Sequence, residues 1–271
     1  MTAFDVRQRV PAGHAVSAIA AIAWRDVVKL LRDRPRLAVN LAFPILLVVG
    51  LGNVLRATVG PATGLDAVPL AFSGVLAATL FQSTAAGMIS IVEDRETDFA
   101  RELFVAPVAR WSLVAGKIAG EVAVALAQGV CVVAVALLIG VPLDVAQVAR
   151  LLPVALACCL LGGAFGLATI GVLPNQRSAM QVFQFLIIPQ YVLAGVLVPV
   201  HGLPGYLDWI ARAMPMRYAV DLSRAAYYAG TPSRAAAVIG DPIVDAVVVG
   251  GLFAILVVAG ASLFDYRARI R

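Results

Sequence analysis

Long stretches without Asp, Glu, Lys or Arg dominate the pattern of polar and apolar positions along the chain. Six of them are 19 to 30 residues long, and their apolar positions are continuous rather than alternating with a period of two. They cover residues 37–55, 67–92, 122–143, 151–176, 178–207 and 246–264. Because about 20 apolar residues in a helix cross a hydrocarbon layer about 30 Å thick, each stretch can hold one spanning helix. The continuous apolarity argues against a β-barrel.

We therefore expect an all-α membrane protein with six transmembrane helices. The predicted spans lie near residues 37–55, 68–92, 118–140, 151–173, 180–200 and 244–264. They form one transmembrane domain over residues 37–264, which follows a cytoplasmic N-terminal segment (1–36) and precedes a short cytoplasmic tail (265–271).

The charges predict how the chain is oriented. Six spans place both termini on one side, and the segments on that side carry 15 Lys and Arg residues against 6 on the other. The positive-inside rule then makes both termini cytoplasmic. With 61% hydrophobic and 14% charged residues, the composition excludes a water-soluble enzyme, a disordered tail and a secreted disulfide scaffold. The net charge of +5 fits the anionic inner leaflet and does not require nucleic acid as a partner.

The N-terminal segment has the pattern of an amphipathic helix that lies in the inner membrane interface. Apolar residues recur at helical spacing from Val16 to Leu31, and Arg25, Lys29 and Arg32 share the opposite face. Residues 34–36, Arg-Pro-Arg, end this helix before the first span. A signal peptide cleaved near residues 21–23 is the alternative. The apolar pattern continues past Trp24, which favours the interfacial helix.

The cytoplasmic segment between the second and third spans concentrates charge. Its charges alternate in sign, Phe99 and Leu103 share one face, and Pro107 ends the predicted short helix. A solvated turn is one interpretation of this segment. A docking surface for another protein is the more specific one, and the paired charges with the apolar ridge favour it. The predicted docking residues are Glu93, Arg95, Glu96, Asp98, Phe99, Arg101, Glu102, Leu103 and Phe104.

Lys117 and Glu121 follow this segment at a spacing of four, which predicts an ion pair near the start of the third span. A proton-relay role for Glu121 is the alternative, because ionisable residues inside membranes are often functional.

The second long hydrophilic segment, 199–245, lies on the outer side. Leu207, Ile210 and Met214 fall on one helical face, so we expect short re-entrant helices before the sixth span, acting as a plug or as a gate. The predicted extracytoplasmic gate residues are Pro204, Pro215, Tyr218, Asp221 and Arg224.

Amides and small residues within the spans indicate helix contacts. The fifth span carries Gln181, Gln184 and Gln190, and polar amides in hydrocarbon need partners, so they join helices or line a substrate route. Gly116/Gly120 and Gly162/Gly166 have the GxxxG spacing of close helix approach.

The sequence contains none of the common catalytic motifs. It has no GxxxxGK[ST] phosphate loop, no HExxH, no GxSxG and no Cys/His cluster. Cys131, Cys158 and Cys159 fall in predicted spans without CxxC spacing, so we interpret them as packing residues and expect no metal site. The energy for any transport then comes from another chain or from an ion gradient.

Residues 95–110 with Gly116-Lys117 resemble the loop between the second and third spans of ABC-2 type transporter permeases. The most similar group is the bacterial daunorubicin-resistance-like exporters, which are associated with multidrug resistance. Residues 202–204 with Pro215, Tyr218, Asp221 and Arg224 resemble the stretch before that family's last span. The chain departs from the family at Asp98-Phe99, where Gly-Thr is frequent.

The resemblance implies a transmembrane subunit that is not itself an enzyme and binds no cofactor. ATP and Mg²⁺ would be bound by a separate ABC ATPase subunit, present in two copies, which docks on the coupling helix at 93–106. A second permease copy or a sister permease would complete the transporter. In the family the first, second and fifth spans line the cavity, which implies a substrate pathway of Asn40, Phe43, Phe81, Gln82, Gln184, Phe185 and Tyr191.

The expected function is therefore ATP-driven export of a hydrophobic drug, lipid or natural product across the plasma membrane by alternating access. Export of a polysaccharide or lipid-linked glycan is a related alternative. A proton-coupled secondary transporter that uses Glu121 and a membrane scaffold without transport are alternatives from other classes. Arginine outnumbers lysine 19 to 2, which is typical of a GC-rich bacterial source.

Overall fold

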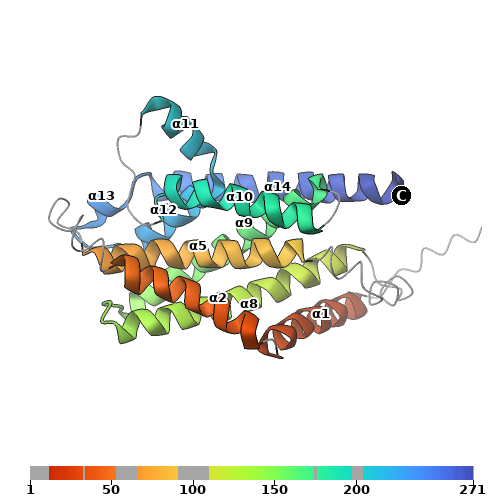
Figure 1. The fold of residues 1–271 in the computed structure, drawn as a ribbon, viewed down its shortest axis with the longest axis horizontal. Coiled ribbons are helices and arrows are strands. Elements are labelled where there is room, and N and C mark those ends of the chain that lie inside the picture. Colours follow the sequence, from red (N-terminus) through yellow and green to blue (C-terminus); the bar gives the residue numbers. More distant parts are fainter. Residues whose placement is uncertain are drawn as a thin grey trace, which may run out of the picture.

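The computed structural model describes residues 12–32, 34–52, 66–90, 110–173, 176–196 and 204–270. Every regular element in these ranges is a helix (Figure 1). The N-terminal half contains α1 (Ala12–Arg32), α2 (Arg34–Leu46), the π-helical turn η1 (Leu47–Leu51), α5 (Ala67–Ile89) and α8 (Arg110–Leu138). The C-terminal half contains α9 (Val145–Val172), α10 (Gln176–Leu193), α11 (Gly205–Ala213), α12 (Pro215–Tyr227), α13 (Arg234–Ala237) and α14 (Pro242–Ile270).

Helix α5 lies at the centre of the bundle and contacts α8, α9, α10 and α12. It is apolar on all sides, and residues 67–81 are all buried, as expected for a helix that other helices surround. Its first turn begins at Asp66, whose carboxylate accepts a hydrogen bond from the Val68 amide. The ring of Phe165 on α9 packs against Phe81 of α5 and against Phe183 of α10, so the three rings join these helices.

Four helical segments among the described residues are long and apolar enough to cross a membrane: Ala67–Ile89, Ala115–Leu138, Val145–Val172 and Arg234–Gly260. They correspond to the second, third, fourth and sixth predicted spans. The first predicted span is shared between α2, which begins with Arg-Pro-Arg and contains Pro44, and η1. The fifth falls on α10, which has 18 residues and carries several glutamines. The total of six spans therefore stays a prediction.

The ends of some helices differ from the predicted boundaries. Helix α8 begins at Arg110 rather than near residue 118, and α14 continues to Ile270 through most of the predicted tail. Helix α1 covers the predicted amphipathic segment, and α2 starts at Arg34, directly after it. A helix can continue beyond the apolar stretch wherever no Pro interrupts it, and residues 110–117 and 265–270 contain none.

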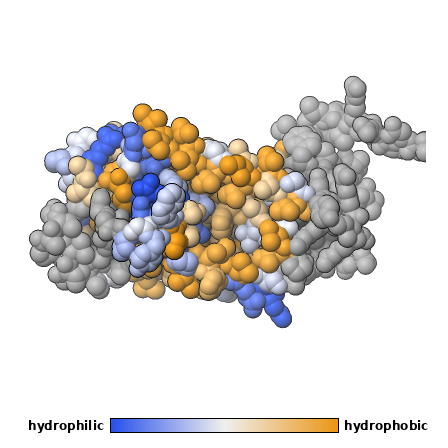
Figure 2. Space-filling model, turned by 90° about the horizontal axis from the view of Figure 1, so that it is seen from above, coloured by the Kyte–Doolittle hydropathy of each residue, from blue (hydrophilic) through white to orange (hydrophobic). Residues whose placement is uncertain are grey.

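The outer surface of the bundle is largely apolar. Figure 2 shows hydrophobic side chains over the middle of the molecule, with hydrophilic ones gathered towards the end that carries α11 and α13. Val130, Leu152, Ile255 and Val258 are each more than 60% exposed, although they lie on long helices. Such a surface is unfavourable in water and suits lipid chains. Helix α1 and the C-terminal end of α14 lie at the opposite end (Figure 1).

Candidate functional site

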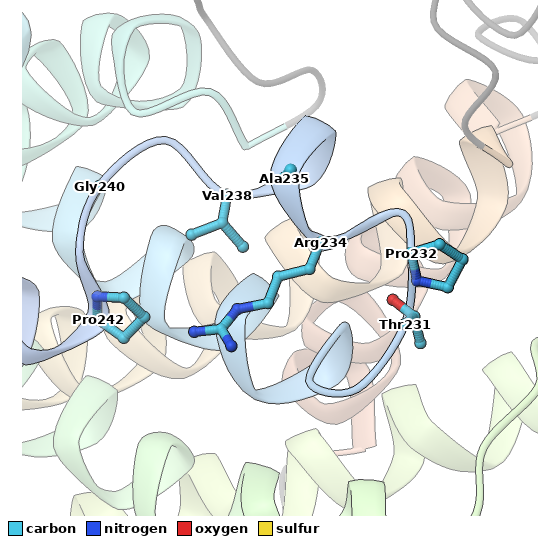
Figure 3. A pocket seen from close by; sticks show the side chains of 7 residues that line it. All are labelled: Thr231, Pro232, Arg234, Ala235, Val238, Gly240 and Pro242. Atoms are coloured by element: carbon cyan, nitrogen blue, oxygen red, sulfur yellow. The ribbon is translucent and has the colours of Figure 1, made fainter.

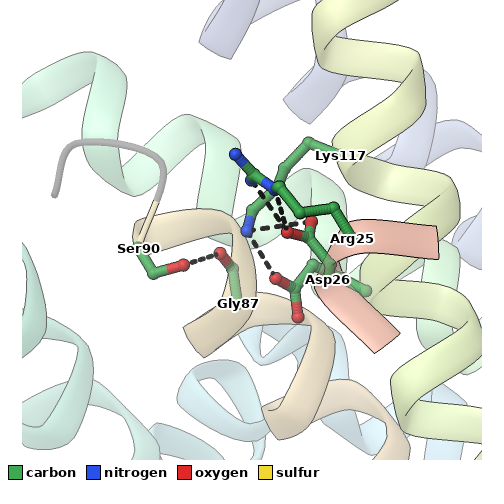
Figure 4. Close-up of polar contacts among 6 residues, drawn as sticks. Arg25, Asp26, Gly87, Ser90 and Lys117 are labelled. Atoms are coloured by element: carbon green, nitrogen blue, oxygen red, sulfur yellow. Dashed lines mark hydrogen bonds and ion pairs between the residues drawn. The ribbon is translucent and has the colours of Figure 1, made fainter. Parts of the chain in front are cut away.

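Four charged side chains meet where α1 packs on α8, and we call them the ion cluster: Arg25, Asp26, Lys117 and Glu121. Lys117 Nζ lies 3.1 Å from Asp26 Oδ2 and 2.8 Å from Glu121 Oε1. Arg25 Nη2 lies 2.8 Å from Asp26 Oδ1. Figure 4 shows Arg25 and Lys117 converging on Asp26 from two helices. The side chains of Asp26, Lys117 and Glu121 are at most 7% exposed, so the ion pairs form in a region of low dielectric.

The predicted pairing of Lys117 with Glu121 is confirmed, and Asp26 is the partner that the sequence did not reveal. Asp26 is seven residues after Ile19 and three after Ala23, so at helical spacing it falls on the apolar face of the amphipathic helix. An acidic residue among the apolar positions of this helix was the signal that could have identified it.

Glycines allow the helices around the ion cluster to approach closely. A Cβ atom on Gly120 would lie 3.0 Å from both Ala23 Cα and Asp26 Oδ2, and one on Gly116 would lie 3.1 Å from Ile22. On α5, a Cβ atom on Gly87 would overlap the Glu121 carboxylate. The predicted close approach at Gly116 and Gly120 is confirmed, and the helix that approaches there is α1.

A second contact joins three of the predicted pathway residues. The Tyr191 hydroxyl of α10 donates a hydrogen bond of 2.8 Å to Gln82 Oε1 of α5. The Phe43 ring of α2 packs edge-on against the Tyr191 ring, with centroids 6.5 Å apart. The first, second and fifth predicted spans therefore meet at one place, which we call the three-helix contact.

The remaining predicted pathway residues lie elsewhere. Phe81 is completely buried in the core beside Phe165, on a different face of α5 from Gln82. Gln184 and Phe185 are exposed on α10, Phe185 by 76%. Asn40 belongs to α2, and its side chain is outside the described structure. The transport role of all seven residues stays a prediction.

At the opposite end of the bundle, Arg224 of α12 is completely buried. Its Nη2 donates to the carbonyl oxygens of Gly195 and Val196, directly after α10. Burial lowers the pKa of Arg224 to about 10, while the neighbouring Asp221 carboxylate acts in the opposite direction, so the guanidinium stays charged at neutral pH. The Ser223 hydroxyl donates to the Ser73 carbonyl at 2.8 Å and so links α12 to α5.

Asp221 connects α12 to the start of α14. Its two carboxylate oxygens accept hydrogen bonds from the amides of Ile239 and Gly240, at 2.8 and 2.6 Å. The carboxyl group of Asp245 is also buried beside Asp221, and its Oδ2 has no hydrogen-bond partner in the described structure.

The other predicted gate residues lie in or beside α11 and α12. Pro215 is the buried first residue of α12, and Pro204 is the exposed residue before α11. The Tyr218 hydroxyl donates to the Arg212 carbonyl at 2.7 Å. Pro215, Tyr218, Asp221 and Arg224 all belong to α12, and we call their contacts the outer cluster; Pro204 lies apart from it, before α11.

A model of the ABC-2 type transporter family matches residues 17–228. The chain belongs to this family. No curated protein matches the sequence. The protein is thus a membrane permease component of an ABC transporter, a type of subunit that is not catalytic and that in general works with an ABC ATPase. The matched range includes the ion cluster, the three-helix contact and all of α12.

The predicted docking residues of this ABC-2 permease, from Glu93 to Phe104, lie outside the described residues. The described helices do reach both sides of that segment, because α5 is followed by Ser90 and α8 begins at Arg110. The coupling helix itself stays a prediction.

One pocket of about 370 Å³ lies on the permease between α12 and α14 (Figure 3). Figure 3 shows Arg234 crossing it between Pro232 and Pro242. Among the described residues there is no group of acidic, histidine and cysteine side chains that could hold a metal ion. Cys158 and Cys159 are buried free thiols, in agreement with a packing role.

Proposed function

We propose that this ABC-2 permease exports a hydrophobic drug, lipid or natural product from a bacterial cell. Two permease subunits would enclose the pathway, and two ABC ATPase subunits would dock on residues 93–106 and supply the energy. The three-helix contact carries the proposal, because it joins aromatic rings to a single polar hydrogen bond where the expected cavity-lining spans meet. Binding sites for apolar molecules have this composition.

The exposed faces of α2 and α10 support the pairing of two permeases. Phe43 is 49% exposed, and on α10 Phe185, Ile188 and Val192 are each more than 60% exposed. These faces adjoin the three-helix contact rather than lying opposite it. In a pair of subunits they would line a shared apolar cavity, in which substrate could contact both copies.

The ion cluster argues against a proton-coupled transporter based on Glu121. Glu121 lies 2.8 Å from Lys117, and the two cations and two anions of the cluster balance one another. The ion pair with Lys117 engages the Glu121 carboxylate in a structural contact of α8. We therefore keep export driven by a partner ATPase as the proposed mechanism.

Docking can be tested by co-purification with the ATPase encoded in a neighbouring reading frame. We expect Glu96→Lys, Glu102→Lys and Phe99→Ala each to abolish co-purification, because they alter the charged face and the apolar ridge of the predicted coupling helix. Arg212→Glu, at the opposite end, serves as the control and should leave the complex intact. Complex formation that is unchanged in all three variants would refute the docking assignment.

Export can be tested with hydrophobic fluorescent dyes in cells that express both proteins. Inactivation of the ATPase should stop efflux, whereas Glu121→Gln should preserve its dependence on ATP. Efflux that persists without ATP hydrolysis and follows the proton gradient would favour the secondary transporter. Efflux that is absent for every dye, together with accumulation of a glycan precursor, would favour the glycan exporter.

A further inference from the structure

The ion cluster lies between the two flanks of the predicted docking segment. On one flank, Gly87 occupies the last turn of α5, where the Ser90 hydroxyl donates to the Gly87 carbonyl at 2.8 Å (Figure 4). On the other flank, Lys117 and Glu121 occupy the third and fourth turns of α8. The segment between Ser90 and Arg110 is joined covalently to both of these helices, and an ion pair connects α1 to one of them.

From these contacts we infer that Lys117 is a positioning residue that fixes α1 to α8 and α5 as one mechanical unit. The inference rests on the proposed function, because it supplies a route by which a docked ATPase could act on the membrane helices. Lys117 forms ion pairs with a carboxylate on each of two helices, Asp26 of α1 and Glu121 of α8.

The charge balance of the ion cluster favours one position of α1 along α8. Lys117 lies between two carboxylates, and Arg25 supplies the second positive charge on Asp26. Displacing α1 along α8 would leave Asp26 and Lys117 buried without each other. Buried charges are far more costly unpaired than paired, so α1 has one preferred register rather than a continuum of positions.

The shapes of the helices around the ion cluster support the same register. The Glu121 carboxylate occupies the space that a side chain at Gly87 would need, so α8 fits directly against α5. Asp26 and Ala23 are in close contact with Gly120, so α1 fits directly against α8. The glycines allow the helices to pack closely in more than one register, and the ion pairs favour one of these registers.

Movement of this unit reaches the three-helix contact through α2. Helix α1 ends at Arg32, α2 begins at Arg34, and the two helices are also in contact. Helix α2 carries Phe43, whose ring packs against Tyr191. A shift of α1 relative to the bundle would therefore displace one wall of the proposed pathway.

The first test measures hydrogen–deuterium exchange of the full-length protein in detergent. Lys117→Met keeps most of the side-chain volume but leaves two buried carboxylates with one cation. We expect exchange in α1 to become about tenfold faster, with α9 and α14 unchanged. Arg150→Met, which removes an exposed cation from α9, is the control and should not alter α1.

A second variant keeps the test valid if Lys117→Met does not fold. In the double variant Lys117→Met/Glu121→Met the remaining Arg25–Asp26 pair is balanced, so folding should be retained. No ion pair of the cluster then joins α1 to α8, and α1 should again exchange faster. Wild-type protection of α1 in this double variant would overturn the inference, because packing alone would then hold the helix.

The functional test uses the reconstituted complex with its ATPase. The double variant should still bind the ATPase and hydrolyse ATP, whereas dye export per ATP should fall about tenfold. An unchanged export-to-ATP ratio would also overturn the inference. If the wild-type chain binds no ATPase, the proposed function fails instead, and the exchange experiment still decides whether Lys117 positions α1.

Discussion

Tyr191 and Gln82 lie 109 positions apart in the chain and are joined by a hydrogen bond of 2.8 Å. The bond links α10 to α5 in a part of the molecule where few polar groups are available. Phe43 packs on the same tyrosine ring, so one residue connects three helices. Loss of the hydroxyl would leave the Gln82 oxygen without this donor while the ring contact remains.

We therefore expect Tyr191→Phe to reduce the free energy of unfolding by about 1 kcal/mol, the usual net value of such a hydrogen bond. Thermal unfolding of the purified protein, followed by tryptophan fluorescence, measures this change. Tyr218→Phe is the matched control, because its hydroxyl bonds to the Arg212 carbonyl at an exposed position and should contribute less. Equal losses in the two variants would contradict a special role for the three-helix contact.

Two adjacent glycines in α9 should respond oppositely to the same substitution. A Cβ atom on Gly162 would overlap the Phe81 carbonyl oxygen and the Thr84 hydroxyl of α5, whereas one on Gly163 would meet only Met88 Cγ, at 3.8 Å. We expect Gly162→Ala to destabilise the protein by about 1–3 kcal/mol through overpacking. Gly163→Ala should be neutral or stabilise it by about 0.5–1 kcal/mol, because Ala favours the helix.

Thermal unfolding and size-exclusion profiles of the two alanine variants measure this contrast. If Gly162→Ala were as stable as Gly163→Ala, the close crossing of α5 and α9 would be wrong.

Arg224 should stabilise the end of α10. Its guanidinium donates to the carbonyl oxygens of Gly195 and Val196 from a completely buried position. We expect Arg224→Met to cost about 1.5–3 kcal/mol, the range for hydrogen bonds to a charged group. Hydrogen exchange in residues 186–196 should accelerate.

Arg212→Met is the control for Arg224. The Arg212 side chain is 64% exposed, and its ion pair with Asp208 lies at the surface. Its removal should change stability by less than about 1 kcal/mol, as for other surface ion pairs. An effect on residues 186–196 as large as that of Arg224→Met would contradict the assignment.

The two carboxyl groups of the Asp221–Asp245 pair should differ in their tolerance of amides. Both oxygens of Asp221 accept backbone hydrogen bonds, so Asp221→Asn would turn an amide group towards an N–H donor. We expect a loss of about 1–3 kcal/mol from this mismatch. Asp245 Oδ2 has no hydrogen-bond partner in the described structure, so Asp245→Asn loses no hydrogen bond there and should be close to neutral. Thermal unfolding of both variants tests this order, and the reverse order would contradict the role assigned to the backbone hydrogen bonds of Asp221.

The sequence predicted those features that depend on neighbours along the chain. The charge-free stretches became α5, α8, α9 and α14 because a segment of about 20 apolar residues must satisfy its backbone hydrogen bonds internally. Lys117 and Glu121 pair because residues four apart share a helix face. The GxxxG spacings indicated close approach for the same local reason.

The tertiary structure decided which residues from different helices meet. Nothing local distinguishes Phe81, which is buried in the core, from Phe185, which is exposed. The contacts of Asp26 with Lys117 and of Glu121 with Gly87 depend on the rotation and register of three helices. Those quantities follow from packing the whole bundle at once, because each helix surface offers several ridges and grooves of similar spacing. The sequence by itself therefore determined the helices and the family resemblance, and only the packing determined the ion cluster, the three-helix contact and the outer cluster.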